Sequence, residues 1–170
     1  MGWEFSDPDR HDSRTIEVDG ISTTLVGAAK SDAEVSNTDG GPSWIVGVDH
    51  VVVMTPSLDR TCGAITEQLG LPLKRIREVG GGVRQGFHRV GPVIVEVVER
   101  PDIDAGAPAR LWGLVFNVSD LDWAVADLGP DVIGEPRDAV QKGRRIATIR
   151  TEAGLGIPLA LMTPDIRPNR

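Results

Sequence analysis

The chain has 170 residues and a mass of 18.2 kDa, which suits one compact domain or two small fused modules. Hydrophobic residues make up 40% of the chain and charged residues 25%, which excludes a disordered or fibrous protein. The net charge of -7, without any cluster of Lys and Arg, excludes a nucleic-acid partner, and no apolar run approaches the roughly 20 residues of a membrane helix. The first residues also lack the basic-then-apolar order of a signal peptide, so we expect a cytoplasmic protein.

Residues 1–43 are polar and acidic, and we interpret them as an N-terminal extension. Within this extension the dipeptide Asp19-Gly20 separates two short β-like segments, and it tolerates the positive φ angles of a type I′ turn. The pattern therefore predicts a β-hairpin. Residues 31–43 are rich in Ser, Asp and Gly, a composition that is typical of a linker.

From Trp44 onward the sequence repeats itself, and a duplicated unit constrains the fold more than any single residue does. Residues 49–59 match residues 112–122 at a constant offset of 63. Each copy has the pattern of a β-strand followed by the start of a helix.

Both copies carry the start and stop signals of a helix. In the first copy, apolar residues recur at spacings of 4, 3 and 4 from Leu58 to Leu69, and Gly70 ends the pattern. In the second copy, Asp120 can cap a shorter helix that stops at Gly129. The single cysteine, Cys62, lies within the first apolar stripe and is expected in the core.

Each predicted helix is followed by short β-like segments that are separated by turn residues. They cover residues 73–78, 84–90 and 93–99 in the first copy, and 132–133, 145–150 and 157–162 in the second. The sequence therefore predicts an α+β fold of two tandem βαβββ modules, residues 44–104 and 105–170, whose curved mixed sheets enclose one cavity. We expect the modules to pair, because roughly 55 residues with one helix bury too little apolar surface to fold alone.

Two side chains in the first module are candidates for chemistry. His50 begins a strand and faces the same side as Val52 and Met54. Glu96 interrupts an apolar strand, where an unpaired carboxylate would cost several kcal/mol unless it were partnered or bound to a metal. Residue chemistry alone favours structural roles: an imidazole bonded to the backbone for His50, and for Glu96 an ion pair with one of two arginines, Arg84 or Arg89.

The repeat, with His50 and Glu96 in these places, resembles the vicinal oxygen chelate superfamily over residues 44–164. This superfamily includes glyoxalase I, extradiol dioxygenases, methylmalonyl-CoA epimerase, and the fosfomycin and bleomycin resistance proteins. There, a first-strand histidine and a last-strand glutamate of each module hold one divalent metal. The resemblance therefore implies that His50 and Glu96 are metal ligands or catalytic residues. The matching positions of the second module are Gly113 and Ala160, which cannot bind a metal, so the implied site is only half present.

The cavity implied by the resemblance should be mostly apolar. A tight turn at Val90-Gly91 would place Gln85 and Phe87 on the cavity face beside Glu96, and would point His88 outward into solvent. A turn that is longer by one residue would reverse this assignment. Arg84 is either an ordinary surface arginine or a contact for an anionic group of the substrate. The other residues expected to line the cavity are Val52, Met54, Val115, Asn117 and Met162.

Two functions remain open at this point. In the first, the protein is a glyoxalase-like binder that holds a small molecule, as the related bleomycin resistance proteins sequester a drug. In the second, it is an enzyme, a lyase, isomerase or dioxygenase, in which a divalent metal or His50 itself promotes the reaction with Glu96. The missing ligands at Gly113 and Ala160 favour the binder over ordinary glyoxalase chemistry. The resemblance leaves open whether the modules pair within one chain or across a homodimer.

Overall fold

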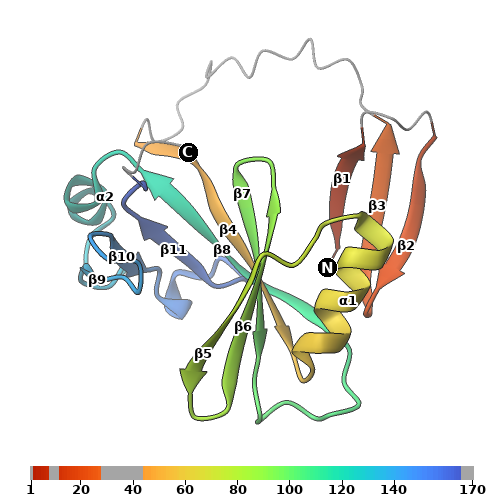
Figure 1. The fold of residues 1–170 in the computed structure, drawn as a ribbon. Helices are drawn as coiled ribbons and strands as arrows, with labels where there is room; N and C mark the ends of the chain where they lie inside the picture. The colour runs from red at the N-terminus through yellow and green to blue at the C-terminus, as the bar shows by residue number, and fades with distance from the viewer. Residues whose placement is uncertain (1, 8–11, 28–43, 166–170) are drawn as a thin grey trace. The chain divides into compact units, whose positions relative to one another are not determined.

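The computed structural model describes residues 2–7, 12–27 and 44–165 (Figure 1). These residues pack into two compact units, which are described separately below. The first unit contains the N-terminal strands together with Val52–Val90 and Val95–Leu111, and the second contains residues 44–51, Gly91–Ile94 and 112–165. The predicted linker, residues 31–43, lies outside the described part of the chain. No helix within the described residues is long and apolar enough to cross a membrane.

The N-terminal extension forms a three-stranded sheet with the order β1-β3-β2. Its strands are β1 (Trp3–Asp7), β2 (Arg14–Val18) and β3 (Ile21–Gly27). The predicted hairpin is confirmed: β2 and β3 are antiparallel, and Asp19 and Gly20 have φ angles of 48° and 84° in the turn between them. The sequence did not predict β1, which pairs in parallel with β3.

The first module contains one helix and four strands, which are ordered β5-β6-β7-β4. The elements are β4 (Ile45–Thr55), α1 (Leu58–Leu69), β5 (Arg75–Gly80), β6 (Val83–Val90) and β7 (Val93–Glu99). Helix α1 has the predicted bounds. The side chain of Ser57 caps its first turn, and Gly70, with φ of 67°, ends it in the left-handed conformation.

The second module repeats this plan. Its elements are β8 (Arg110–Val118), α2 (Leu121–Leu128), β9 (Arg137–Asp138), β10 (Arg145–Thr148), the 3-10 turn η1 (Thr151–Ala153) and β11 (Leu159–Met162). The strand order β8-β11-β10-β9 places the first strand beside the last, as in the first module. The α+β fold of two βαβββ modules is thus confirmed. The strand predicted at residues 132–133 is reduced to a single bridge between Ile133 and Ile149.

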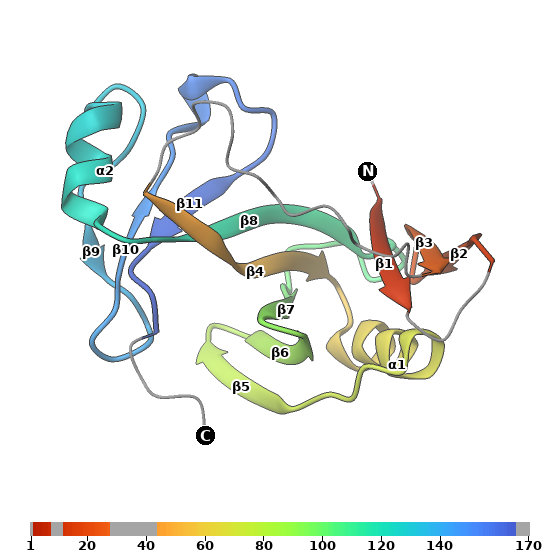
Figure 2. The ribbon, with the colours of Figure 1, turned by 90° about the horizontal axis from the view of Figure 1, so that it is seen from above.

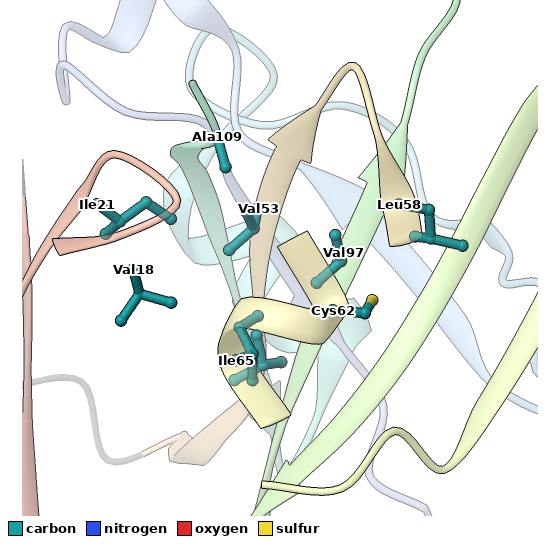
Figure 3. Close-up of a cluster of buried hydrophobic side chains, with 9 residues drawn as sticks. Val18, Ile21, Val53, Leu58, Cys62, Ile65, Val97 and Ala109 are labelled. Atoms are coloured by element: carbon teal, nitrogen blue, oxygen red, sulfur yellow. The ribbon is translucent and has the colours of Figure 1, made fainter. Parts of the chain in front are cut away.

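The core of the first unit joins the N-terminal sheet to α1 (Figure 3). Val18 and Ile21 of the hairpin lie against Ile65 of α1, and Val53 of β4 and Val97 of β7 belong to the same cluster. Figures 1 and 2 both show α1 next to the N-terminal strands. The extension therefore covers apolar surface of α1 that water would otherwise contact.

Polar contacts hold the hairpin turn in place. The carboxylate of Asp19 accepts hydrogen bonds from the Thr61 hydroxyl and from Nε of Arg60, at 2.5 and 2.7 Å. The backbone N–H of Ala109 donates to the carbonyl of Asp19 at 2.9 Å. Gly20 packs so closely against Pro108 that an added Cβ would overlap the proline ring. Helix α1 and the segment before β8 thus both contact this turn of the extension.

The second unit has its own core beneath α2, which packs beside β10 (Figure 2). Trp44 is 5% exposed and belongs to this cluster with Val118 and Leu121. Asp120 caps α2 as predicted, accepting a hydrogen bond from the backbone N–H of Trp123 at 2.9 Å.

Candidate functional site

His50 belongs to a buried polar network in the second unit. Its Nδ1 lies 2.8 Å from Oδ2 of Asp49, and the two residues are 8% and 7% exposed. The other oxygen of Asp49 accepts a hydrogen bond from Nη2 of Arg144 at 2.7 Å, and the same nitrogen donates to Oδ1 of Asn117 at 2.7 Å. Nε of Arg144 donates to the carbonyl of Thr163 at 2.7 Å. Nδ1 of His50 thus has a carboxylate as its partner.

The network keeps Asp49 ionised. Burial alone would raise the pKa of this carboxyl, but hydrogen bonds from His50 and Arg144 and the charge of Arg144 outweigh it and lower the pKa from 3.8 to about 2. An ionised carboxylate can only accept a hydrogen bond, so Nδ1 of His50 carries the proton. In the neutral imidazole Nε2 is then the basic nitrogen.

A second group of candidate residues lies on one face of the sheet in the first unit. Nε2 of Gln85 donates to Oε1 of Glu96 at 2.7 Å, which confirms that these two side chains share a face. Phe87 lies two positions along the same strand and points to this face as well, half-buried. Arg84 was one of the two arginines expected to pair with Glu96, and otherwise a surface arginine or a contact for a substrate anion; it contacts other carboxylates. These are Asp59, Glu78 and Glu99.

The prediction that His88 points into solvent is wrong. His88 is 1% exposed, and its Nδ1 lies 2.8 Å from the carbonyl oxygen of Leu71. The face of β6 opposite Gln85 is covered by α1, and an added Cβ at Gly86 would lie 2.7 Å from Sγ of Cys62. Burial is the main influence on His88 and lowers its pKa, although hydrogen bonds to the backbone of Leu71 and Pro72 oppose the shift.

The two positions that correspond to the missing metal ligands are closed to larger side chains. An added Cβ at Gly113 would overlap the carbonyl oxygen of Pro158, which already accepts a hydrogen bond from the backbone N–H of Leu114 at 3.1 Å. Ala160 is 7% exposed and packs with Val115 and Met162 in an apolar cluster.

The donor atoms do not fit a metal site with three or more protein ligands. Within the described ranges, no group of three or more His, Cys, Asp or Glu side chains could hold a metal ion. His50 belongs to the second unit and Glu96 to the first, so their joint action stays a prediction.

The remaining predicted cavity residues also divide between the two units. In the first, Val52 is buried and Met54 half-buried, and they alternate along β4 with Val53, which packs in the core beneath α1. In the second, Asn117 contacts Arg144, as described above.

The second unit also contains an apolar pocket of about 280 Å³ that the sequence did not predict. Trp44, Phe116, Leu155 and Leu161 are among its lining residues, and none of the predicted cavity residues lines it. It is therefore separate from the predicted cavity.

No protein-family model matches the sequence, and no curated protein matches it. Solved structures do share its fold. Methylmalonyl-CoA epimerase from Mycobacterium tuberculosis has a TM-score of 0.60 and 22% identity, covering 75% of this chain and 94% of that chain. A hypothetical protein from Bacillus halodurans has a TM-score of 0.60 and 13% identity, covering 72% and 97%.

A third similar structure is Streptomyces coelicolor methylmalonyl-CoA epimerase in complex with 2-nitronate-propionyl-CoA. Its TM-score is 0.57 and its identity 22%, and the match covers 70% of this chain and 97% of that chain. These similarities show that the chain has the fold of the vicinal oxygen chelate proteins.

Proposed function

We propose that this protein binds a small organic molecule on the face of β5–β7 that carries Gln85, Phe87 and Glu96, and that it is not a metal-dependent glyoxalase. The observation that carries the proposal is that the second module has no room for metal-coordinating side chains at the two matching positions. The backbone at Gly113 leaves no room for a histidine, and Ala160 is packed among apolar side chains. Such a site keeps a face that can bind a small molecule. It lacks half of the side chains that would coordinate a metal.

The chemistry of the face also supports binding of a small molecule. Phe87 offers an aromatic surface, and Gln85 and Glu96 add polar groups that can fix the orientation of a ligand. Helix α1 lies against the opposite side of β6 and therefore does not cover this layer of side chains. Similar solved structures hold CoA esters, among them methylmalonyl-CoA.

Native mass spectrometry of the purified protein tests this proposal directly. We expect a bound small molecule that is lost in the variant Phe87→Ala and kept in Ile76→Ala, because Ile76 lies on the other face of the neighbouring strand. Nickel, zinc, manganese and iron should not raise the melting temperature of the protein. A metal-dependent rise that His50→Ala and Glu96→Ala abolish would overturn the proposal in favour of a metal-dependent lyase, isomerase or dioxygenase.

The contact between Asp49 and His50 favours a second candidate function, proton transfer without a metal. Asp49 holds the imidazole with Nδ1 protonated, so Nε2 is the nitrogen that would abstract a proton next to a carbonyl group. This is the kind of step by which an epimerase inverts a carbon centre. The role of Glu96 would be to donate or accept the second proton.

Exchange of the C2 proton of methylmalonyl-CoA in D₂O, followed by proton NMR, tests this second candidate. Exchange above the rate without protein should disappear in His50→Asn, whose amide N–H can keep the contact with Asp49 while the basic nitrogen is lost. The variant His88→Asn is the matched control and should exchange normally. Equal exchange in wild-type protein and His50→Asn would exclude His50 as the base.

A further inference from the structure

Two arginines that were not singled out from the sequence share the face of the proposed ligand. In the antiparallel pair β5 and β6, Arg75 lies opposite Phe87 and Arg77 lies opposite Gln85. Residues that are directly opposite in such a pair point to the same side of the sheet. The face that carries Gln85, Phe87 and Glu96 therefore also carries both arginines, and β5, β6 and β7 are neighbouring strands (Figure 1).

The charges on the two faces of this sheet are compensated differently. On the helix-covered face, Arg84 contacts Asp59, Glu78 and Glu99 at 3.2 to 3.5 Å. Across the part of the chain that the structure describes, neither Arg75 nor Arg77 forms an ion pair with a carboxylate. Arg77 is nevertheless half-buried, and a bound anion would stabilise a positive charge that is partly removed from water.

The guanidinium group of Arg75 is already oriented. It lies over the ring of Phe87, 4.9 Å from the ring centroid. A guanidinium group over an aromatic face is attracted by the ring electrons, and it can still donate its N–H groups to a carboxylate or phosphate. This contact reduces the side-chain entropy that binding would otherwise cost.

We propose that the ligand of this face is an organic anion whose carboxylate or phosphate group is bound by Arg75 and Arg77, with an apolar body that lies against Phe87. This inference rests on the proposed function and adds the substrate class to it. The protein carries a net charge of -7, so its overall field repels anions. Local arginines without carboxylate partners are then the feature that selects an anion at this face.

Titration of the full-length protein with small aromatic probes, followed by two-dimensional ¹H–¹⁵N NMR, tests the inference. The probes are benzoate, phenyl phosphate and the neutral analogue benzamide, so that the carboxylate and phosphate arms are measured separately. We expect benzoate or phenyl phosphate to shift the backbone amide signals of β5 and β6 with an affinity at least about ten-fold higher than that of benzamide. The stronger of the two anions identifies the group that the site prefers.

The double variant Arg75→Gln, Arg77→Gln should lose this ten-fold preference while it keeps the weak binding of benzamide. The double variant Arg110→Gln, Arg137→Gln removes the same charge at two exposed positions on other strands and should keep the preference. Equal affinities for benzamide and the anions, or an unchanged preference in the first double variant, would overturn the inference and leave the proposed binding face intact. If no probe shifts signals of β5 and β6, both the inference and the proposed binding face fail.

Discussion

Nη2 of Arg144 lies 2.7 Å from Oδ1 of Asp49, although 95 residues separate the two in the chain. Both side chains are less than 10% exposed, so this is a buried ion pair. It ties the loop before β10 to the strand that carries His50. The orientation of the imidazole therefore depends on a residue from the other end of the sequence.

Replacement of Arg144 by Ala should destabilise the protein by about 3–5 kcal/mol, because Asp49 would remain buried without its charged partner. Urea unfolding monitored by circular dichroism measures the change. The neighbouring variant Arg145→Ala is the matched control, since Arg145 and its partner Asp122 are 42% and 69% exposed, and it should have little effect. A loss in Arg144→Ala no larger than in the control would contradict the importance of the pair.

Asp49 should make the stability of the protein sensitive to acid. Its pKa in the folded protein is about 2, below the ordinary 3.8, so the unfolded chain binds the proton more tightly. The stabilisation is complete above the ordinary pKa, and it is lost as the pH falls through the folded value. The difference between the two pKa values corresponds to about 2 kcal/mol in the free energy of unfolding. The free energy of unfolding, measured against pH, should fall less steeply in this range for Asp49→Asn than for the wild type.

His88 should add a second acid-sensitive contribution at higher pH. Its pKa is lowered by burial below the ordinary value of 6.5, so the unfolded chain again binds the proton more tightly. Stability should be full above that value and should decrease as the pH falls below it. The variant His88→Asn, which can keep a hydrogen bond to the carbonyl of Leu71, should remove this decrease. Unfolding curves measured between about pH 5 and 7 check the difference.

Gly113 should not tolerate even a methyl group. An added Cβ would overlap the carbonyl of Pro158, so Gly113→Ala should cost about 1–3 kcal/mol of stability. Gly63 lies in α1 with open space around it, and Gly63→Ala should be neutral or stabilise the protein by up to about 1 kcal/mol. Melting temperatures of the two variants provide the comparison. An unchanged melting temperature of Gly113→Ala would show that this position has room for a larger side chain, and the argument against a metal-coordinating residue there would fail.

The local features of the fold could be predicted from the sequence because they depend on neighbouring residues. The bounds of α1 follow from its apolar spacing and from Gly70, and the hairpin at Asp19-Gly20 follows from the turn chemistry of that dipeptide. The repeat at an offset of 63 predicted the βαβββ plan of both modules, because two segments with similar patterns of elements are expected to fold in the same way. The parallel strand β1 was missed, since parallel pairing leaves no turn signal in the sequence.

The site could be predicted only in part, because its contacts join distant residues. Gln85 and Glu96 were placed on one face by the short turn between their strands. Arg144 could not be connected with Asp49, because no periodic pattern links positions so far apart. The error at His88 had a different origin: alternation gives the face of a strand but does not tell whether a helix or solvent covers it.

The contacts of α1 and Ala109 with the turn at Asp19 should hold the extension on the protein even when the chain between them is cut. A backbone cut between residues 28 and 43 would separate the extension covalently but would leave those contacts in place. The two fragments should then stay together as a non-covalent complex, and a peptide of residues 1–27 should restore the stability of a shortened protein that lacks them.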